Sequence, residues 1–139
     1  IYGKKGFYQY QCVIPKKPDG VNYLRKLLQS ISDAKTGSFL AILKLFGPRD
    51  APYLAFASEG YTLALDFPNR TGTDALFKKL DEIVLQSGGR LYLTKDARMS
   101  RTMFEEGYPQ LGLFKAEKKR IDPENRYTSI QAERLGLVH

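Results

Sequence analysis

Tyr92 and Lys95 are the first residues whose types and spacing suggest chemistry. They lie in GGRLYLTKDAR, residues 88–98, where a short apolar stretch follows two glycines. This pattern predicts a strand over residues 90–94, with Lys95 at its end and Asp96 as the cap of a helix. Ligands collect at strand ends, although a lysine there is also commonly an exposed surface residue. Position alone therefore leaves both interpretations of Lys95 open.

The upstream sequence predicts the elements that position this segment. Period-two alternation predicts strands at residues 7–14, 39–46 and 61–67. Helical spacing predicts one helix after Asp19 that ends before Gly37, and a second from Thr73 to Gly88 and Gly89, both glycines being expected in the left-handed conformation. The first helix is expected to bury a stripe made of Val21, Leu24, Leu28 and Ile31. Residues 53–57 are too short a stretch to assign.

The resulting order β-α-β-β-α-β predicts an α+β fold, the split βαβ arrangement of ferredoxin-like domains. Two helices are expected to cover one face of an antiparallel sheet. The uncovered face then carries polar or small residues: Gln9, Gln11, Lys44, Thr62, Ala64 and Asp66. The first and third strands are central in this topology, so Gln9 and Gln11 are expected beside Ala64 and Asp66. Such a face suits a ligand that forms hydrogen bonds, or it is simply the solvated side of the sheet.

Composition limits the classes of function. The 139 residues carry a net charge of +7, one cysteine (Cys12) and one histidine (His139). A single cysteine forms no internal disulfide, and a single histidine argues against His-based metal or triad chemistry. The positive charge permits nucleic acid, an acidic membrane surface or a phosphate-bearing ligand, or it is a solvated basic surface. No phosphate-binding glycine loop occurs, and no apolar run approaches the roughly 18 residues of a membrane span.

An RNA-recognition module is the main alternative from another class. Basic charge, the predicted order of elements and 12% aromatic residues fit such a module. The third strand argues against it, because Thr62, Ala64 and Asp66 face outward where an RNA-binding sheet presents aromatic residues. We therefore expect no nucleic acid partner. A free-standing RNA- or ligand-binding module without catalysis stays as the alternative function.

After Lys95 the pattern changes to short helices, predicted at residues 97–106, 111–120 and 129–135. These helices are too short to form a core of their own. The apolar residues expected to need a surface from outside these 139 residues are Leu111, Phe114, Ile121, Ile130, Leu135 and Leu137.

Four segments in order carry a family resemblance: GKKGFYQYQCVIP (3–15), LAILKLFGPR (40–49), GYTLALDFP (60–68) and GGRLYLTKDAR (88–98). Together with the closing MFEEGYP, IDPENRY and ERLGL, they resemble the FAD-linked oxidoreductases of the decaprenylphosphoryl-β-D-ribose oxidase type, which are vanillyl-alcohol-oxidase-type flavoproteins. The resemblance covers nearly the whole chain.

The resemblance implies a two-domain enzyme with FAD as its cofactor. Residues 1–89 correspond to the end of a substrate-binding cap, and residues 90–139 to the return into the FAD-binding domain, whose N-terminal half is the expected partner. The implied chemistry is hydride transfer from a sugar carbinol carbon to flavin, with the 139 residues alone inactive. A polyprenyl-phosphate-linked sugar or a related small sugar is the expected substrate. A cytoplasmic location, or peripheral contact with the inner membrane, is implied as well.

The resemblance also assigns roles to individual residues. Lys95 matches a lysine that the family needs for activity, and Tyr92 matches a tyrosine that contacts the flavin. The residues that match the family's substrate pocket are Gln9, Gln11, Lys44, Phe46 and Ala64. Ala64 is a departure, because family members that nitroaromatic inhibitors attack covalently have a cysteine there. Cys12 is expected on the opposite face of the sheet and does not replace that cysteine. Because of the departure at Ala64, and because related oxidases act on other sugar alcohols and lactones, the exact substrate stays open.

Overall fold

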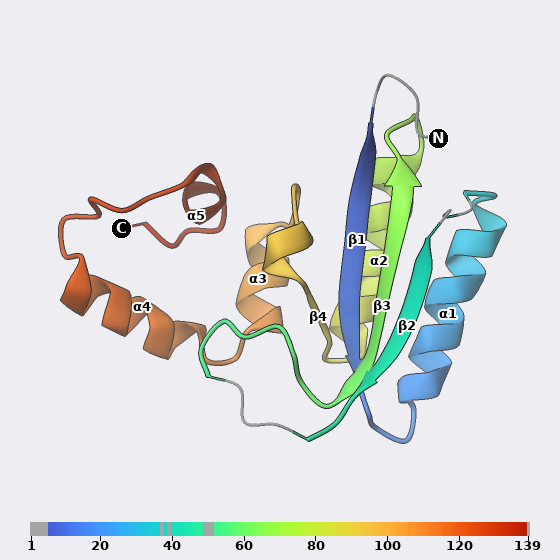
Figure 1. The fold of residues 1–139 in the computed structure, drawn as a ribbon, viewed down its shortest axis with the longest axis horizontal. Helices are drawn as coiled ribbons and strands as arrows, with labels where there is room; N and C mark the ends of the chain where they lie inside the picture. The colour runs from blue at the N-terminus through green and yellow to red at the C-terminus, as the bar shows by residue number, and fades with distance from the viewer. Residues whose placement is uncertain (1–5, 37, 39, 49–51, 139) are drawn as a thin grey trace.

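The chain forms a four-stranded antiparallel sheet with two long helices on one face, followed by three short helices (Figure 1). The structure, a computed structural model, describes residues 6–36, 38, 40–48 and 52–138. The strands are β1 (Phe7–Pro15), β2 (Ala41–Phe46), β3 (Gly60–Pro68) and β4 (Arg90–Leu91). The helices are α1 (Gly20–Asp33), α2 (Thr73–Gln86), α3 (Arg101–Gly107), α4 (Leu111–Ile121) and α5 (Ile130–Arg134), with the 3-10 turn η1 (Leu93–Lys95) before α3. The α+β class predicted from the sequence is confirmed.

Strands β1 and β3 form the centre of the sheet, whose order is β2-β3-β1-β4. The β1–β3 register places Gln9 opposite Asp66 and Gln11 opposite Ala64. β2 pairs with β3 at one edge, and β4 pairs with β1 at the other. The predicted central position of the first and third strands is therefore confirmed. The prediction that Gln9 and Gln11 lie beside Ala64 and Asp66 is confirmed as well.

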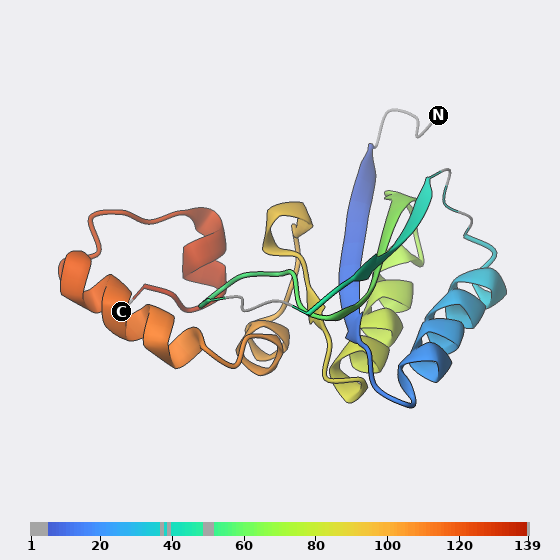
Figure 2. The ribbon, with the colours of Figure 1, turned by 60° about the horizontal axis from the view of Figure 1, so that its bottom comes forward.

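Helices α1 and α2 lie on the same side of the sheet (Figure 2). Alternation along β1 turns Tyr10, Cys12 and Ile14 toward these helices, and all three are buried. The other side chains of this core include Leu24, Leu27, Ile31, Leu63, Leu65, Phe67, Leu76, Phe77, Leu80, Ile83, Val84 and Leu91. The hydrophobic core thus occupies the helix side and leaves the polar face of the sheet for other contacts. The same buried cluster includes Leu111 and Leu135 from the C-terminal segments, so the expectation that these two residues need a surface from outside the chain was wrong.

The buried stripe of α1 differs from the predicted one. Leu27 is buried, whereas Val21 and Leu28 are exposed. The helix is rotated so that Gly20 faces the sheet, where an added Cβ would lie 2.5 Å from the carbonyl oxygen of Pro15. The stripe therefore follows positions i, i+4, i+7 and i+11, starting at Gly20. The prediction was right for Leu24 and Ile31 and wrong for Val21 and Leu28.

Strand β4 is shorter than the predicted strand of residues 90–94. The backbone N–H of Tyr92 still donates to the carbonyl oxygen of Gln11 at 2.9 Å, but the chain then turns. Within that turn, the N–H of Lys95 donates to the carbonyl oxygen of Tyr92, and the N–H of Asp96 donates to that of Leu93. Lys95 therefore lies on a turn just past the strand, and the prediction that the strand runs to Thr94 was wrong.

The boundaries around α3 also correct the sequence prediction. The helix begins at Arg101, and Ser100 caps it by accepting a hydrogen bond from the N–H of Met103 at 3.1 Å. Asp96 has another role and is not the cap. Of the two glycines after α2, only Gly88 has a positive φ, +74°.

The positions of the last two helices agree with the sequence prediction. α4 and α5 lie within about one residue of their predicted positions, as helix ends commonly do. Residues 53–57 form a turn and irregular chain, while Gly37 lies outside the described residues. Among the helices that the structure describes, none is both long and apolar enough to span a membrane.

The close approach of β4 to β1 depends on Gly89. A Cβ there would lie 2.3 Å from the carbonyl oxygen of Val13. We expect Gly89→Ala to lower the free energy of unfolding by about 1–3 kcal/mol, because the strands must separate to admit the methyl group. The matched control is Gly112→Ala on α4, where a Cβ meets nothing within 4 Å. This control should raise stability by about 0.5–1 kcal/mol, since alanine favours helix.

Urea unfolding followed by circular dichroism measures both variants. A Gly89→Ala protein as stable as the parent chain would contradict the β1–β4 packing described above.

Candidate functional site

A hollow of about 150 Å³ lies on the face of the sheet opposite α1 and α2, and we call it the open-face pocket. Its lining residues come from β1, β3, the β2 region and the turn after β4: Gln9, Tyr10, Gln11, Leu40, Ile42, Lys44, Thr62, Ala64, Leu65, Asp66 and Lys95. The structure thus brings together five of the site residues predicted from the sequence: Gln9, Gln11, Lys44, Ala64 and Lys95. Phe46 and Tyr92, also predicted, do not line this pocket.

Cross-strand hydrogen bonds orient the two glutamine side chains on the pocket floor. The amide Nε2 of Gln9 donates to Oδ1 of Asp66 at 3.2 Å, and Nε2 of Gln11 donates to Oγ1 of Thr62 at 3.3 Å. Thr62 and Asp66 are both buried. Each amide has two N–H donors and an acceptor oxygen, so one such bond leaves capacity for a ligand. The two amides on the floor can therefore still form hydrogen bonds with a ligand.

Charges and apolar groups are divided between different parts of the pocket. Lys44 and Lys95 are exposed cations, whereas the carboxylate of Asp66 is part of the buried floor. Two ammonium groups and one carboxylate give a net positive charge, which favours an anionic group of a ligand such as phosphate. Leu40 and Ile42 add an apolar side near β2. The pocket can therefore contact a ligand that combines hydroxyl, anionic and apolar parts.

Tyr92 and Phe46 belong to an aromatic cluster on the same face of the sheet, completed by Phe56. The ring of Tyr92 stacks on Phe56 with the ring centroids 4.6 Å apart, and Phe46 meets Phe56 edge to face at 6.3 Å. Phe56 comes from the segment between β2 and β3, which extends beyond the sheet toward α3 and α4 (Figure 1). Sequence reasoning missed Phe56, because the stretch 53–57 carries no periodic pattern. The predicted ligand contacts of Phe46 and Tyr92 stay predictions.

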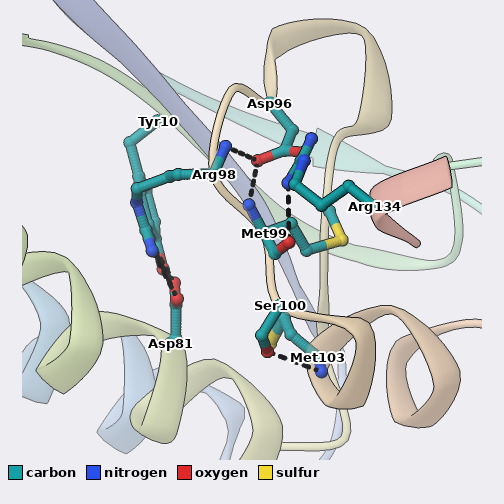
Figure 3. A network of polar contacts seen from close by, with 8 residues as sticks. All are labelled: Tyr10, Asp81, Asp96, Arg98, Met99, Ser100, Met103 and Arg134. Carbon is teal, nitrogen blue, oxygen red and sulfur yellow. Dashed lines mark hydrogen bonds and ion pairs between the residues drawn. The ribbon is translucent and has the colours of Figure 1, made fainter. Parts of the chain in front are cut away.

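The turn that carries Lys95 is fixed by the carboxylate of Asp96, whose side chain is 4% exposed. Its Oδ1 accepts hydrogen bonds from the backbone N–H groups of Arg98 at 2.8 Å and Met99 at 2.6 Å. Its Oδ2 pairs with Nη2 of Arg134 at 2.7 Å (Figure 3). An aspartate that binds backbone N–H groups two and three residues ahead is a local signal for this turn. The partner on α5 had no such signal in the sequence.

A second arginine–carboxylate pair joins the same segment to α2. The guanidinium of Arg98 contacts both carboxylate oxygens of Asp81 at 2.9–3.0 Å and lies over the ring of Phe77 at 4.5 Å. The hydroxyl of Tyr10 donates to the same carboxylate at 3.0 Å. Burial raises the pKa of Asp81, and Arg98 opposes that rise. The pair anchors the chain just after Lys95 to the helix layer.

Metal-dependent chemistry has no donor set in the part of the chain that the structure describes. No group of three or more histidine, cysteine, aspartate or glutamate side chains there could hold a metal ion. The chemistry available in the pocket is hydrogen bonding and charge stabilisation by amides, a hydroxyl and ammonium groups.

Comparison with known proteins shows similarity along nearly the entire chain. No protein-family model matches. The chain is 35% identical over 137 residues to decaprenylphosphoryl-beta-D-ribose oxidase of Mycolicibacterium smegmatis, which covers 99% of this chain and 29% of that protein. It is 34% identical over 134 residues to an uncharacterized protein in the mprA 5' region of Streptomyces coelicolor, 96% of this chain and 36% of that protein. The chain thus spans about a third of these curated relatives, and the resemblance inferred from its four segments is confirmed.

The sheet faces predict opposite reactivities for thiols at two positions. Cys12 is fully buried on the helix side, and burial raises its pKa to about 12. Ala64 is in the open-face pocket. We expect the native chain to resist a maleimide at pH 8, and Ala64→Cys to react more than about a hundredfold faster, because thiolate and access are both required.

Intact-mass spectrometry over time measures the labelling, and the unfolded chain serves as the control that labels at Cys12. Rapid labelling of Cys12 in the native chain would show that the face assignment is wrong.

Proposed function

We propose that this chain is the C-terminal part of an FAD-dependent oxidoreductase that oxidises a carbinol carbon of a sugar resembling decaprenylphosphoryl-ribose. The observation that carries the proposal is one pocket in which five residues, each assigned to substrate or catalysis by the family resemblance, come together. The 35% identity over 99% of the chain supports the same conclusion. Residues 1–89 would belong to the substrate-binding cap, and residues 90–139 to the FAD-binding domain.

The chemistry of the pocket supports a sugar as the substrate. The amides of Gln9 and Gln11 can each donate to and accept from sugar hydroxyl groups. A volume of about 150 Å³ is below the roughly 300–1,000 Å³ of complete small-molecule sites, so the pocket would hold one part of the substrate. The sugar ring fits this polar part, with Lys44 available for a phosphate. The apolar side formed by Leu40 and Ile42 suits the beginning of a lipid chain.

The catalytic role falls to Lys95. Its ammonium group carries three N–H donors and can hold the hydroxyl group of the reacting carbon, or a nearby phosphate. FAD supplies the hydride acceptor when it is bound, and the protein orients the substrate beside it. Tyr92 is the proposed flavin contact on this chain. The two residues are close along the chain, since the N–H of Lys95 donates to the carbonyl oxygen of Tyr92 at 3.1 Å.

Exposed apolar side chains on the C-terminal helices support a missing protein surface. Leu113 and Ile121 on α4 and Ile130 on α5 are all exposed. Exposed apolar side chains of this size suit a surface that another part of a protein covers. The remainder of the FAD-binding domain is the proposed cover.

The uncovered face gives little support to RNA binding. Its central positions on β1 and β3 are occupied by residues such as Gln9, Gln11 and Ala64, which offer no ring for a base to stack on. The nearest predicted aromatic contact, Tyr92, is already stacked on Phe56. A ligand-binding module without catalysis is the alternative that the next experiment distinguishes.

The full-length protein that contains this chain tests the proposed function. We expect it to hold FAD and, mixed anaerobically with a decaprenylphosphoryl-ribose analogue, to lose the absorbance of oxidised flavin. A protein that binds the sugar without reducing flavin would instead be a non-catalytic binding module.

Lys95→Ala in that protein is expected to slow flavin reduction at least about tenfold, because a charge-assisted hydrogen bond contributes roughly 1.5–3 kcal/mol. FAD occupancy should stay at the parent level, since Lys95 is not the proposed cofactor contact. Lys78→Ala is the matched control, because Lys78 is exposed on α2, away from the pocket lining. Single-turnover stopped-flow spectroscopy measures the rate, and an unchanged rate for Lys95→Ala would return this lysine to the surface-residue interpretation.

A further inference from the structure

The segment that follows Lys95 is held by two ion pairs, and Figure 3 shows Asp96 beside Arg134 and Arg98 beside Asp81. Asp96, the next residue, pairs with Arg134 of α5, and Arg98 pairs with Asp81 of α2. The segment contributes the carboxylate to the pair with α5 and the guanidinium to the pair with α2. Lys95 lies one residue before Asp96 and three residues before Arg98.

Helix α5 contacts the backbone of the turn as well as the side chain of Asp96. Nη1 of Arg134 donates to the carbonyl oxygen of Met99 at 2.6 Å, while its Nη2 pairs with Asp96. Nε2 of Gln131, one turn earlier on α5, donates to the carbonyl oxygen of Leu93 at 2.9 Å. These contacts lie on both sides of Lys95 in the sequence. Helix α5 therefore fixes the backbone from which the Lys95 side chain projects.

Because Asp96 is buried, loss of its ion pair with Arg134 is energetically costly. Its carboxylate is nearly inaccessible to water, and Arg134 is its charged partner at 2.7 Å. Removing one partner of a buried pair leaves an uncompensated charge, which strongly favours rearrangement of the surrounding chain. A rearranged turn would move Lys95, and a misplacement of about 1 Å at a reacting group can slow a reaction about a hundredfold.

We propose that Arg134, acting through Asp96, is a positioning residue that holds Lys95 against the open-face pocket. This inference rests on the proposed function only where turnover is measured. Arg134 itself lies outside the pocket lining, so its effect on the reaction passes through the turn.

A double-mutant cycle in the full-length protein tests the route of this effect. We expect Arg134→Ala to slow flavin reduction about tenfold when Lys95 is present and less than about twofold in the Lys95→Ala background. Residues that act through one another are non-additive, whereas a general structural defect slows both backgrounds equally. Substrate affinity, measured by titration, should change little. Arg134→Lys keeps the charge but loses the planar fork that reaches both Asp96 and Met99, so an intermediate rate is expected.

Arg120→Ala is the matched control, because Arg120 is an exposed arginine on α4 that pairs with Glu117. It should leave the rate unchanged. An unchanged rate for Arg134→Ala, or equal slowing in both Lys95 backgrounds, would overturn the positioning role.

Amine labelling with mass spectrometry supplies a readout that needs no turnover. Arg134→Ala should change the labelling rate of Lys95 severalfold and leave that of Lys78 unchanged. If the parent protein does not reduce flavin, the proposed function fails, and the labelling result still decides the positioning inference. Equal labelling of Lys95 in the parent and Arg134→Ala proteins would overturn it.

Discussion

The antiparallel register between β1 and β3 is the constraint on which both the core and the pocket depend. It pairs nine residues of each strand, from Phe7 with Pro68 to Pro15 with Gly60. Cys12 and Leu63 meet on the helix side, where both are buried. The same register places Gln9 beside Asp66 on the other side. Because side chains alternate, a slip by one residue would exchange the two faces and remove core and pocket together.

The site extends beyond the sheet because the turn after β4 is fastened to distant segments. The backbone N–H of Tyr92 still donates to the carbonyl oxygen of Gln11. After Tyr92, side-chain contacts hold the segment in place of strand pairing. Arg98 reaches α2, and Asp96 reaches α5. The lysine at the pocket edge thus depends on the sheet, the helix layer and the last helix of the chain. Under the proposed function, this junction is where the substrate cap meets the FAD-binding domain.

Sequence patterns predicted the face on which a strand residue lies, because that depends on local alternation. They failed for element lengths and helix phase where contacts between distant residues determine the structure. Alternation alone assigned Gln9, Gln11 and Cys12 to their correct faces. The length of β4 was wrong, because the strand gives way to a turn whose Asp96 pairs with a partner 38 residues away. The phase of α1 depends on the close fit of Gly20 against β1, and periodicity does not encode that fit. Phe56, which stacks on Tyr92, comes from irregular chain. Alternation also placed Lys44 and Ala64 on the uncovered face, and spacing singled out Tyr92 and Lys95, but only the resemblance of four segments to a known family added Phe46 and gave these residues roles.

The central claim is that the open-face pocket holds the reacting sugar and presents it to Lys95. A crystal structure of the full-length protein with FAD and a substrate analogue measures this most directly. We expect the sugar ring to lie on Gln9 and Gln11, with the Lys95 ammonium within hydrogen-bonding distance of a sugar hydroxyl or the phosphate and the flavin ring on the other side of the sugar. A sugar bound elsewhere, or an open face directed away from the flavin with Lys95 in solvent, would contradict it.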